Sequence, residues 1–248
     1  MAGVESKKSD LGVRALSAIV MVVVAGTALW LGGWGWTLFV AAVGIGVMLE
    51  WWGLVRGFVN GVLGRVLWLL GGLVYVGLAV AMLMAFRAEP IPGWAMLIVV
   101  LLGVIFTDVG AYFAGRTIGG PKIAPAISPS KTWAGLGGGI LGASLAVTIS
   151  TWIYTGPAFA RAAGIELDPS ELGSRWPSPA AALIAGTALA VVAQAGDFFE
   201  SWMKRRAGVK DSGKLIPGHG GLFDRTDGMI AVLFALGLLS LHSFVFKA

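Results

Sequence analysis

The sequence predicts an all-α membrane protein, a polytopic bundle of about seven transmembrane helices in a single domain. Of the 248 residues, 57% are hydrophobic and only 12% are charged, whereas a typical soluble domain carries roughly 25% charged residues. The apolar residues fall in blocks of about 20, the length that a helix needs to cross a hydrocarbon core. Too few charges remain to cover a water-exposed surface, so lipid is the expected solvent for most of the chain.

Seven apolar blocks mark the predicted spans. Unpaired backbone polar groups are too costly in lipid, and the alternating pattern of a membrane barrel is absent, so each block is expected to be helical. Short or broken helices would add spans in pairs, up to about nine. The 38 glycines favour close packing between helices. The predicted spans are residues 13–31, 35–55, 62–86, 93–113, 132–155, 179–199 and 226–246.

The basic residues predict the orientation of the chain. With seven spans, the N-terminus and segments 56–61, 114–131 and 200–225 share one side of the membrane, which carries most of the Lys and Arg residues. Because positively charged loops stay in the cytoplasm, this side is predicted to be cytoplasmic. Topology and anionic headgroups also explain the net charge of +5, so a nucleic-acid partner is not expected. The basic residues assigned to the opposite side are Arg87, Arg161, Arg175 and Lys247.

Acidic residues occur in or beside the predicted spans, where each ionisable side chain costs roughly 2.5 to 3.5 kcal/mol and needs a reason. Glu50 lies near a cytoplasmic helix end and is expected simply to reach the headgroup layer. Asp108 precedes a loop that carries Arg116, and both are candidates for supporting the site, although a paired structural Asp108 is the alternative. The other acidic positions are Asp197 with Glu200 and Asp224 with Asp227.

A polar loop at residues 119–133 leads into the fifth predicted span. Hydroxyl groups beside a lysine, just before a helix, can bind an anion through the helix N-terminus. Ser128, Lys131 and Thr132 are the candidate residues in this loop. These three residues are therefore candidates for binding an anion.

The densest group of polar residues begins near the end of the sixth predicted span. Asp197, Ser201 and Lys204 have helical spacings of four and three, so one helix face presents a carboxylate, a hydroxyl and an ammonium group. A loop rich in Gly, Ser and Pro follows and leads to Asp224 and Asp227, three residues apart. Since the chain has no cysteine, a metal must take oxygen or imidazole ligands, and a few carboxylates plus phosphates suit Mg²⁺. The pattern predicts a polyphosphate and metal site at the cytoplasmic membrane face.

Residues 201–227, here called the signature segment, read S-W-M-K-R-R-A-G-V-K-D-S-G-K-L-I-P-G-H-G-G-L-F-D-R-T-D. This segment resembles the signature of the phosphatidate cytidylyltransferase family, also called CDP-diacylglycerol synthases. Residues 108–132 and 194–200 look like the family too. Residues 1–92 match only in being hydrophobic and are interpreted as spans of variable sequence, with 93–248 as the catalytic portion. Gly228 stands where many members have a serine.

The resemblance implies a nucleotidyltransferase that converts CTP and phosphatidic acid into CDP-diacylglycerol and pyrophosphate for phospholipid synthesis. It implies Mg²⁺ as cofactor, a second cation that could be monovalent, membrane lipids as surroundings, and a homodimer. The expected location is the bacterial cytoplasmic (inner) membrane, with the N-terminus and the active site on the cytoplasmic side.

The resemblance also suggests roles for individual residues. Asp197 and Asp224 would hold the metal with Asp227 assisting, and together with Lys204 they form the predicted catalytic set. His219 is expected to orient the loop or contact phosphate, because a nucleophile that is already an ionised phosphate needs no strong general base. The further candidates for binding substrate or phosphate are Ser201, Arg205, Lys210, Asp211 and Arg225.

Two other functions remain open at the level of sequence. A CTP-dependent polyprenol kinase would transfer the γ-phosphoryl group to a lipid alcohol and release CDP, but the continuous match from Lys204 to Asp227 disfavours it. A transporter of an anionic solute would place its charges near the bilayer midplane and show repeated halves, whereas here the charges gather at one face. The sequence has neither a Walker A motif nor a kinase glycine-rich loop with its partner motifs.

Overall fold

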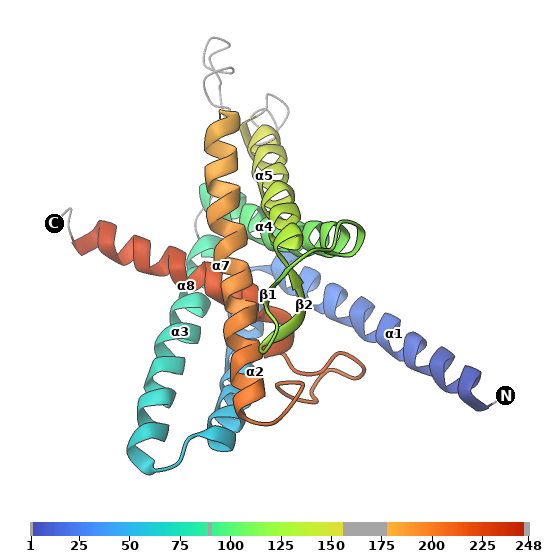
Figure 1. The fold of residues 1–248 in the computed structure, drawn as a ribbon. Coiled ribbons are helices and arrows are strands. Elements are labelled where there is room, and N and C mark those ends of the chain that lie inside the picture. Colours follow the sequence, from blue (N-terminus) through green and yellow to red (C-terminus); the bar gives the residue numbers. More distant parts are fainter. Residues whose placement is uncertain (1, 89–90, 156–177, 246–248) are drawn as a thin grey trace, which may run out of the picture.

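The computed structural model describes residues 2–88, 91–155 and 178–245, and most of them are helical (Figure 1). Seven of the helices described are long and apolar enough to cross a membrane, which confirms the predicted all-α bundle. Their bounds are α1 Ala2–Leu31, α2 Gly33–Phe58, α3 Val62–Ala88, α4 Ile91–Thr117, α5 Trp133–Thr155, α7 Pro179–Arg206 and α8 Phe223–Val245.

Helix α7 shows how local sequence sets the helix ends. Ser178 precedes the helix and its side chain accepts a hydrogen bond from the backbone N–H of Ala181, while Pro179 occupies the first turn. The helix continues to Arg206, beyond the predicted end at residue 199, and its last turn holds three basic residues that complement the helix dipole. The polar residues from 200 to 206 therefore lie on the helix rather than in a loop.

Helices α4 and α5 pack along glycines, as the abundance of glycine predicts. A Cβ atom at Gly110 of α4 would overlap the backbone carbonyl of Gly138, and one at Gly142 of α5 would overlap that of Phe106. The two backbones therefore touch directly, which is typical of close helix contacts in membranes. Helix α5 also packs against α7, α7 against α8, α8 against α3, and α3 against α2.

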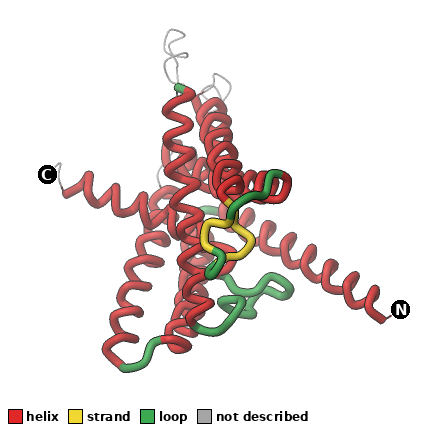
Figure 2. The backbone as a smooth tube through the Cα atoms, viewed as in Figure 1, coloured by secondary structure: helices red, strands yellow, loops and turns green. Residues whose placement is uncertain are grey.

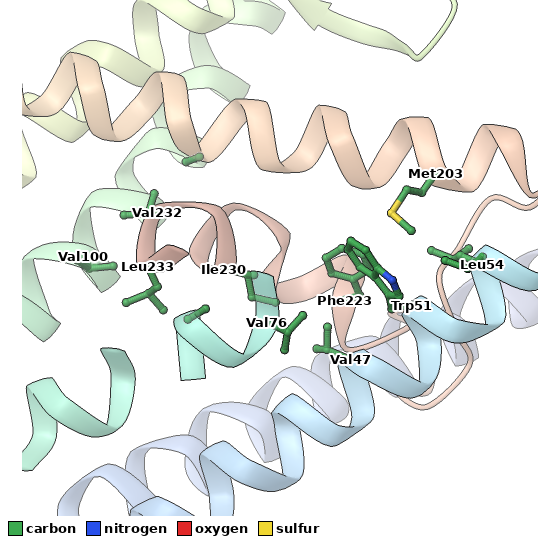
Figure 3. Packing of buried hydrophobic residues seen from close by; sticks show 13 residues of the cluster. Val47, Trp51, Leu54, Val76, Val100, Met203, Phe223, Ile230, Val232 and Leu233 are labelled. Atoms are coloured by element: carbon green, nitrogen blue, oxygen red, sulfur yellow. The ribbon is translucent and has the colours of Figure 1, made fainter. Parts of the chain in front are cut away.

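An aromatic cluster fills the main core between α2, α3, α7 and α8. Trp51 lies at its centre and contacts the rings of Trp68, Tyr75, Phe199 and Phe223 at centroid distances of 5.7 to 5.9 Å. Its indole N–H donates a 3.0 Å hydrogen bond to the carbonyl of Trp68, so the only polar atom of the ring is satisfied. Figure 3 shows Trp51 beside Phe223, between the ribbons of α2 and α7.

Helix α1 extends away from the other helices (Figure 1). Among its described side chains only Ala28 is buried, in a small cluster with Trp36 and Val40 of α2 and Leu97 of α4. A second contact joins α1 to the loop before α8, because the hydroxyl of Ser17 lies 2.8 Å from Nδ1 of His219.

A short hairpin stands where the sequence predicts only a polar loop. Strands β1 (Lys122–Ala124) and β2 (Ser128–Thr132) pair antiparallel, with Lys122 opposite Thr132. The prolines and hydroxyl residues of this stretch hide the strand pattern. Figure 2 shows the hairpin in yellow at the ends of α4 and α5. Arg205 of α7 contacts it by donating a 3.4 Å hydrogen bond to the carbonyl of Ile127.

The glycine contact between α4 and α5 yields a prediction with a matched control. In Gly138→Val the new side chain would collide with Ala114 and the backbone of Gly110, and overpacking of this kind costs about 1–3 kcal/mol. Gly137→Val adds the same side chain where a Cβ meets no atom within 4 Å. We expect a lower thermal unfolding temperature in detergent for Gly138→Val alone. Equal unfolding temperatures for the two variants would contradict the packing described.

Candidate active site

The signature segment forms three consecutive parts of the structure. It starts on the last turns of α7, continues through a loop at residues 207–222, here called the signature loop, and ends on the first turn of α8. Gly208, Gly218 and Gly220 of this loop have positive φ angles, a conformation that other residues rarely adopt. The loop thus folds back on itself and brings the ends of α7 and α8 together.

A buried ion triad joins α7 to α8. Nζ of Lys204 lies 2.5 Å from Oε2 of Glu200, one turn earlier on α7, and 2.6 Å from Oδ1 of Asp224 on α8. The side chains of Glu200, Asp224 and Lys204 are 1%, 5% and 12% exposed. An ionised group buried alone would be very costly, so each charge depends on the others.

Asp224 also organises the signature loop. Its second oxygen, Oδ2, accepts hydrogen bonds from the backbone N–H groups of Ser212 at 2.9 Å and Gly221 at 2.8 Å, and lies 3.0 Å from the Ser212 hydroxyl. Both oxygens of this predicted metal ligand are therefore bonded to protein donors. Its side chain is also only 5% exposed, whereas that of Asp197 is 34% exposed, so the geometry gives Asp224 a positioning role, and metal binding by Asp224 stays a prediction.

Glu50 belongs to the same network, and the expectation that it merely reaches the headgroup layer is wrong. Its carboxylate accepts hydrogen bonds from the backbone N–H groups of Leu222 and Phe223 and from the hydroxyl of Ser212. A carboxylate beside Trp51 in an apolar helix indicates that Glu50 has hydrogen-bond partners. The sequence does not identify them, because they lie more than 160 residues further along the chain.

A second cluster of charges lies around Asp197. Nζ of Lys131, on β2, is 2.5 Å from Oδ2 of Asp197, and the Ser201 hydroxyl donates a 3.3 Å hydrogen bond to Oδ1. Asp227 of α8 is close enough to Asp197 and Asp108 for their charges to interact. The structure therefore brings together carboxylates from α4, α7 and α8 near the ammonium group of Lys131.

A cavity of about 470 Å³ opens beside this second cluster. Asp197 and Lys131 line it together with three other charged residues, so it offers both cations for phosphate and carboxylate oxygen for a metal. Gln194 also lines it, and the buried amide nitrogen of this residue makes no hydrogen bond to any residue that the structure describes. Its charged and polar lining residues are Asp108, Tyr112, Arg116, Lys122, Ser130, Lys131, Thr132, Gln194 and Asp197.

The remaining predicted residues lie around these two clusters. Thr132 is buried and its hydroxyl caps α5 by accepting a 3.0 Å hydrogen bond from the N–H of Gly135. Arg225 donates to the carbonyl of His219, and Nδ1 of the His219 ring lies beside Ser17 of α1. Lys210 and Asp211 are exposed on the signature loop, and Ser128 is nearly buried at the start of β2.

The donor set determines what kind of metal site fits. Within the described part of the chain, no three His, Asp or Glu side chains are grouped so as to hold an ion by themselves. Asp197 and Asp227 are neighbours, however, and Mg²⁺ commonly binds one or two carboxylates and completes its shell with waters and substrate phosphates. These residues fit an open site of that type rather than a protein cage.

Known proteins resemble this chain over nearly its whole length. The sequence profile of the Cytidylyltransferase family matches residues 58–242. The chain is 33% identical to a phosphatidate cytidylyltransferase of Brucella suis biovar 1 (strain 1330), over 96% of this chain and 95% of that protein. The chain belongs to the cytidylyltransferase family. A phosphatidate cytidylyltransferase of Rickettsia bellii (strain RML369-C) is 35% identical over 91% of this chain and 89% of its own length.

Membership of the cytidylyltransferase family confirms the resemblance seen in the signature segment and makes the chain a nucleotidyltransferase of the membrane. The matched region contains every predicted site residue. Sequence reasoning named Glu200 beside Asp197 but gave it no role in the site, although its spacing of four from Lys204 is that of a helical ion pair. It also missed Glu50, which lies outside the matched region.

The buried triad yields a stability prediction. Lys204→Met would leave Glu200 and Asp224 without their shared cation, and breaking a buried ion pair in this way costs about 3–5 kcal/mol. We expect a clear fall in the unfolding temperature in detergent, partly reversed when Glu200→Gln is added. Lys214→Met, which removes an equal charge from an exposed position of the signature loop, is the control. The triad has no structural importance if Lys204→Met is as stable as this control.

Proposed function

We propose that this protein transfers the cytidylyl group of CTP to phosphatidate, giving CDP-diacylglycerol and pyrophosphate, at the cytoplasmic face of the bacterial inner membrane. The observation that carries the proposal is the cavity beside Asp197, where Arg116, Lys122 and Lys131 supply positive charge at the ends of spanning helices. The names of the relatives point to the same reaction. A nucleotide can enter such a cavity from water while the acyl chains of the lipid stay in the leaflet.

The proposed reaction needs positioning and charge neutralisation more than proton transfer. A phosphate oxygen of phosphatidate attacks the α-phosphorus of CTP, and the new P–O bond forms as the bond to the bridging oxygen breaks. Pyrophosphate leaves with the bonding electrons, in line with the attacking oxygen. Because the nucleophile is already ionised, the residues of the cavity have two tasks, to hold two anions side by side and to offset their repulsion.

Each cluster contributes differently to this task. Lys131 is held at the cavity wall by Asp197, so its ammonium group is in place before substrate arrives. Gln194 and Arg116 line the same space. Lys204 is fixed by the buried triad, where it holds the end of α7 to the start of α8 beside the signature loop.

Mg²⁺ is part of the proposal, with Asp197 and Asp227 as the residues that would hold it. When bound, the ion would offset the negative charge of the phosphates. The second cation and the homodimer that the resemblance implies also stay proposals.

The reaction can be tested on purified protein with CTP labelled at the α-phosphate, phosphatidate in mixed micelles and Mg²⁺. We expect label in the lipid fraction and release of pyrophosphate. In Lys131→Met the rate should fall by about 100-fold or more, the usual effect of losing one group that stabilises a transition state. Arg206→Gln, which removes a charge that stacks on Trp202 outside the cavity, should keep the activity of the parent protein.

The alternatives give different outcomes in the same assay. Transfer of label only from γ-labelled CTP to a polyprenol, with release of CDP, would identify a kinase instead. A well-folded preparation that transfers neither label would favour a transporter.

The metal assignment has its own prediction. A chelator should abolish transfer of the label, and added Mg²⁺ should restore it. Asp227→Asn should raise the Mg²⁺ concentration for half-maximal rate by about tenfold or more, as loss of a metal-site partner does. Asp224→Asn should lower the rate with little change in that concentration, because its oxygens are bonded to Lys204 and the signature loop. A similar Mg²⁺ shift in Asp224→Asn would instead make Asp224 a ligand.

A further inference from the structure

Glu50 makes three hydrogen bonds that join α2 to the most polar part of the molecule. Oε1 accepts from the N–H of Leu222 at 2.9 Å, and Oε2 accepts from the N–H of Phe223 at 2.8 Å. Oε2 also lies 2.9 Å from the hydroxyl of Ser212. All three partners belong to the signature segment, whereas Glu50 lies before the residues that the family profile matches.

A carboxylate suits this position for a physical reason. Helix α8 begins at Phe223, so the N–H groups of Leu222 and Phe223 have no carbonyl partner inside the helix. Donors at a helix N-terminus carry partial positive charge and bond best to an anion. Glu50 therefore caps α8 from a different helix.

The signature loop is built around this carboxylate. A Cβ atom at Gly213 or at Gly221 would overlap the carboxylate oxygens of Glu50. Only glycine leaves room there, so the backbone of the loop closes on Glu50 from two sides. This close approach indicates a specific contact rather than a surface charge that happens to lie nearby.

The contact continues to the buried triad through one hydroxyl group. Oγ of Ser212 is 2.9 Å from Oε2 of Glu50 and 3.0 Å from Oδ2 of Asp224, and it accepts a 3.2 Å hydrogen bond from the N–H of Asp224. Asp224 in turn holds Lys204. Glu50 is thus linked to the ammonium group of Lys204 through two intervening side chains.

We propose that Glu50 is a positioning residue for the reaction. It holds the signature loop and the start of α8 against α2, so that Asp224 keeps Lys204 in its working position. The effect on turnover rests on the proposed function, while the effect on the loop does not.

The test compares the variants Glu50→Gln and Glu50→Asp with Arg56→Gln as control. Glutamine keeps the size of the side chain but replaces one acceptor oxygen with an NH₂ donor. This donor would face N–H groups of the signature segment, so at least one hydrogen bond would be lost. Aspartate keeps the charge but is one methylene shorter. Arg56 lies less than two turns further along α2, is exposed, and stacks on Trp52. It makes no hydrogen bond or ion pair with the signature loop within the part of the chain that the structure describes.

Hydrogen exchange measured by mass spectrometry reads the loop directly. In Glu50→Gln, amide exchange at residues 212–224 should accelerate by about tenfold or more, because hydrogen bonds to a charged acceptor are lost. Exchange in α4 and α5 should not change. The turnover number should fall by a similar factor, with Glu50→Asp between the parent protein and Glu50→Gln, and Arg56→Gln should match the parent protein in both measurements.

A double-mutant cycle then tests the route through Ser212. If Glu50 acts through this hydroxyl, Glu50→Gln combined with Ser212→Ala should lose little more activity than the more severe single variant. Unchanged exchange in Glu50→Gln, faster exchange with unchanged turnover, or effects that simply multiply in the double variant would each overturn the proposal. Faster exchange in all helices would overturn it too, by showing a general role in folding.

The same design separates this inference from the proposed function. If the parent protein transfers no cytidylyl group, that function fails. The exchange data still report whether Glu50 holds the signature loop.

Discussion

The pairing of Lys204 with Glu200 and Asp224 is the interaction on which the rest of the site depends. Three ionisable groups lie buried at the end of a membrane bundle, where none could be charged alone. Pairing them requires the last turns of α7 and the first turn of α8 to meet. The signature loop then connects two helix ends that are held close together. Its glycines and backbone N–H groups lie around Asp224 and Glu50.

The two charge clusters differ in a way that suits a transferase. The triad is buried and its ammonium group is paired with two carboxylates, so it holds the ends of α7 and α8 in place. The cluster around Asp197 borders an open cavity, and its ammonium group comes from a hairpin on a different pair of helices. Rigid support and accessible charge are thus supplied by separate residues.

Much of this was predictable from the sequence, and the remainder has identifiable causes. Hydrophobic blocks of membrane length predict the spans, and helical spacing places Asp197, Ser201 and Lys204 on one face. The hairpin at residues 122–132 was not predicted, because its prolines and hydroxyl residues do not form the alternating pattern of a strand. The partners of Glu50 were not predicted either, because they depend on how α2 packs against a loop far along the chain. No local sequence pattern predicts such a contact.

The glycine contact between α4 and α5 has a mechanical consequence. Interdigitating side chains can slip past one another by changing rotamer, but two backbones in contact have no such freedom. Helices α4 and α5 therefore move as one body, and the hairpin that joins them is carried on a stiff base. The cavity thus has one wall on this base and the other on α7, and the ion pair between Lys131 and Asp197 joins the two walls.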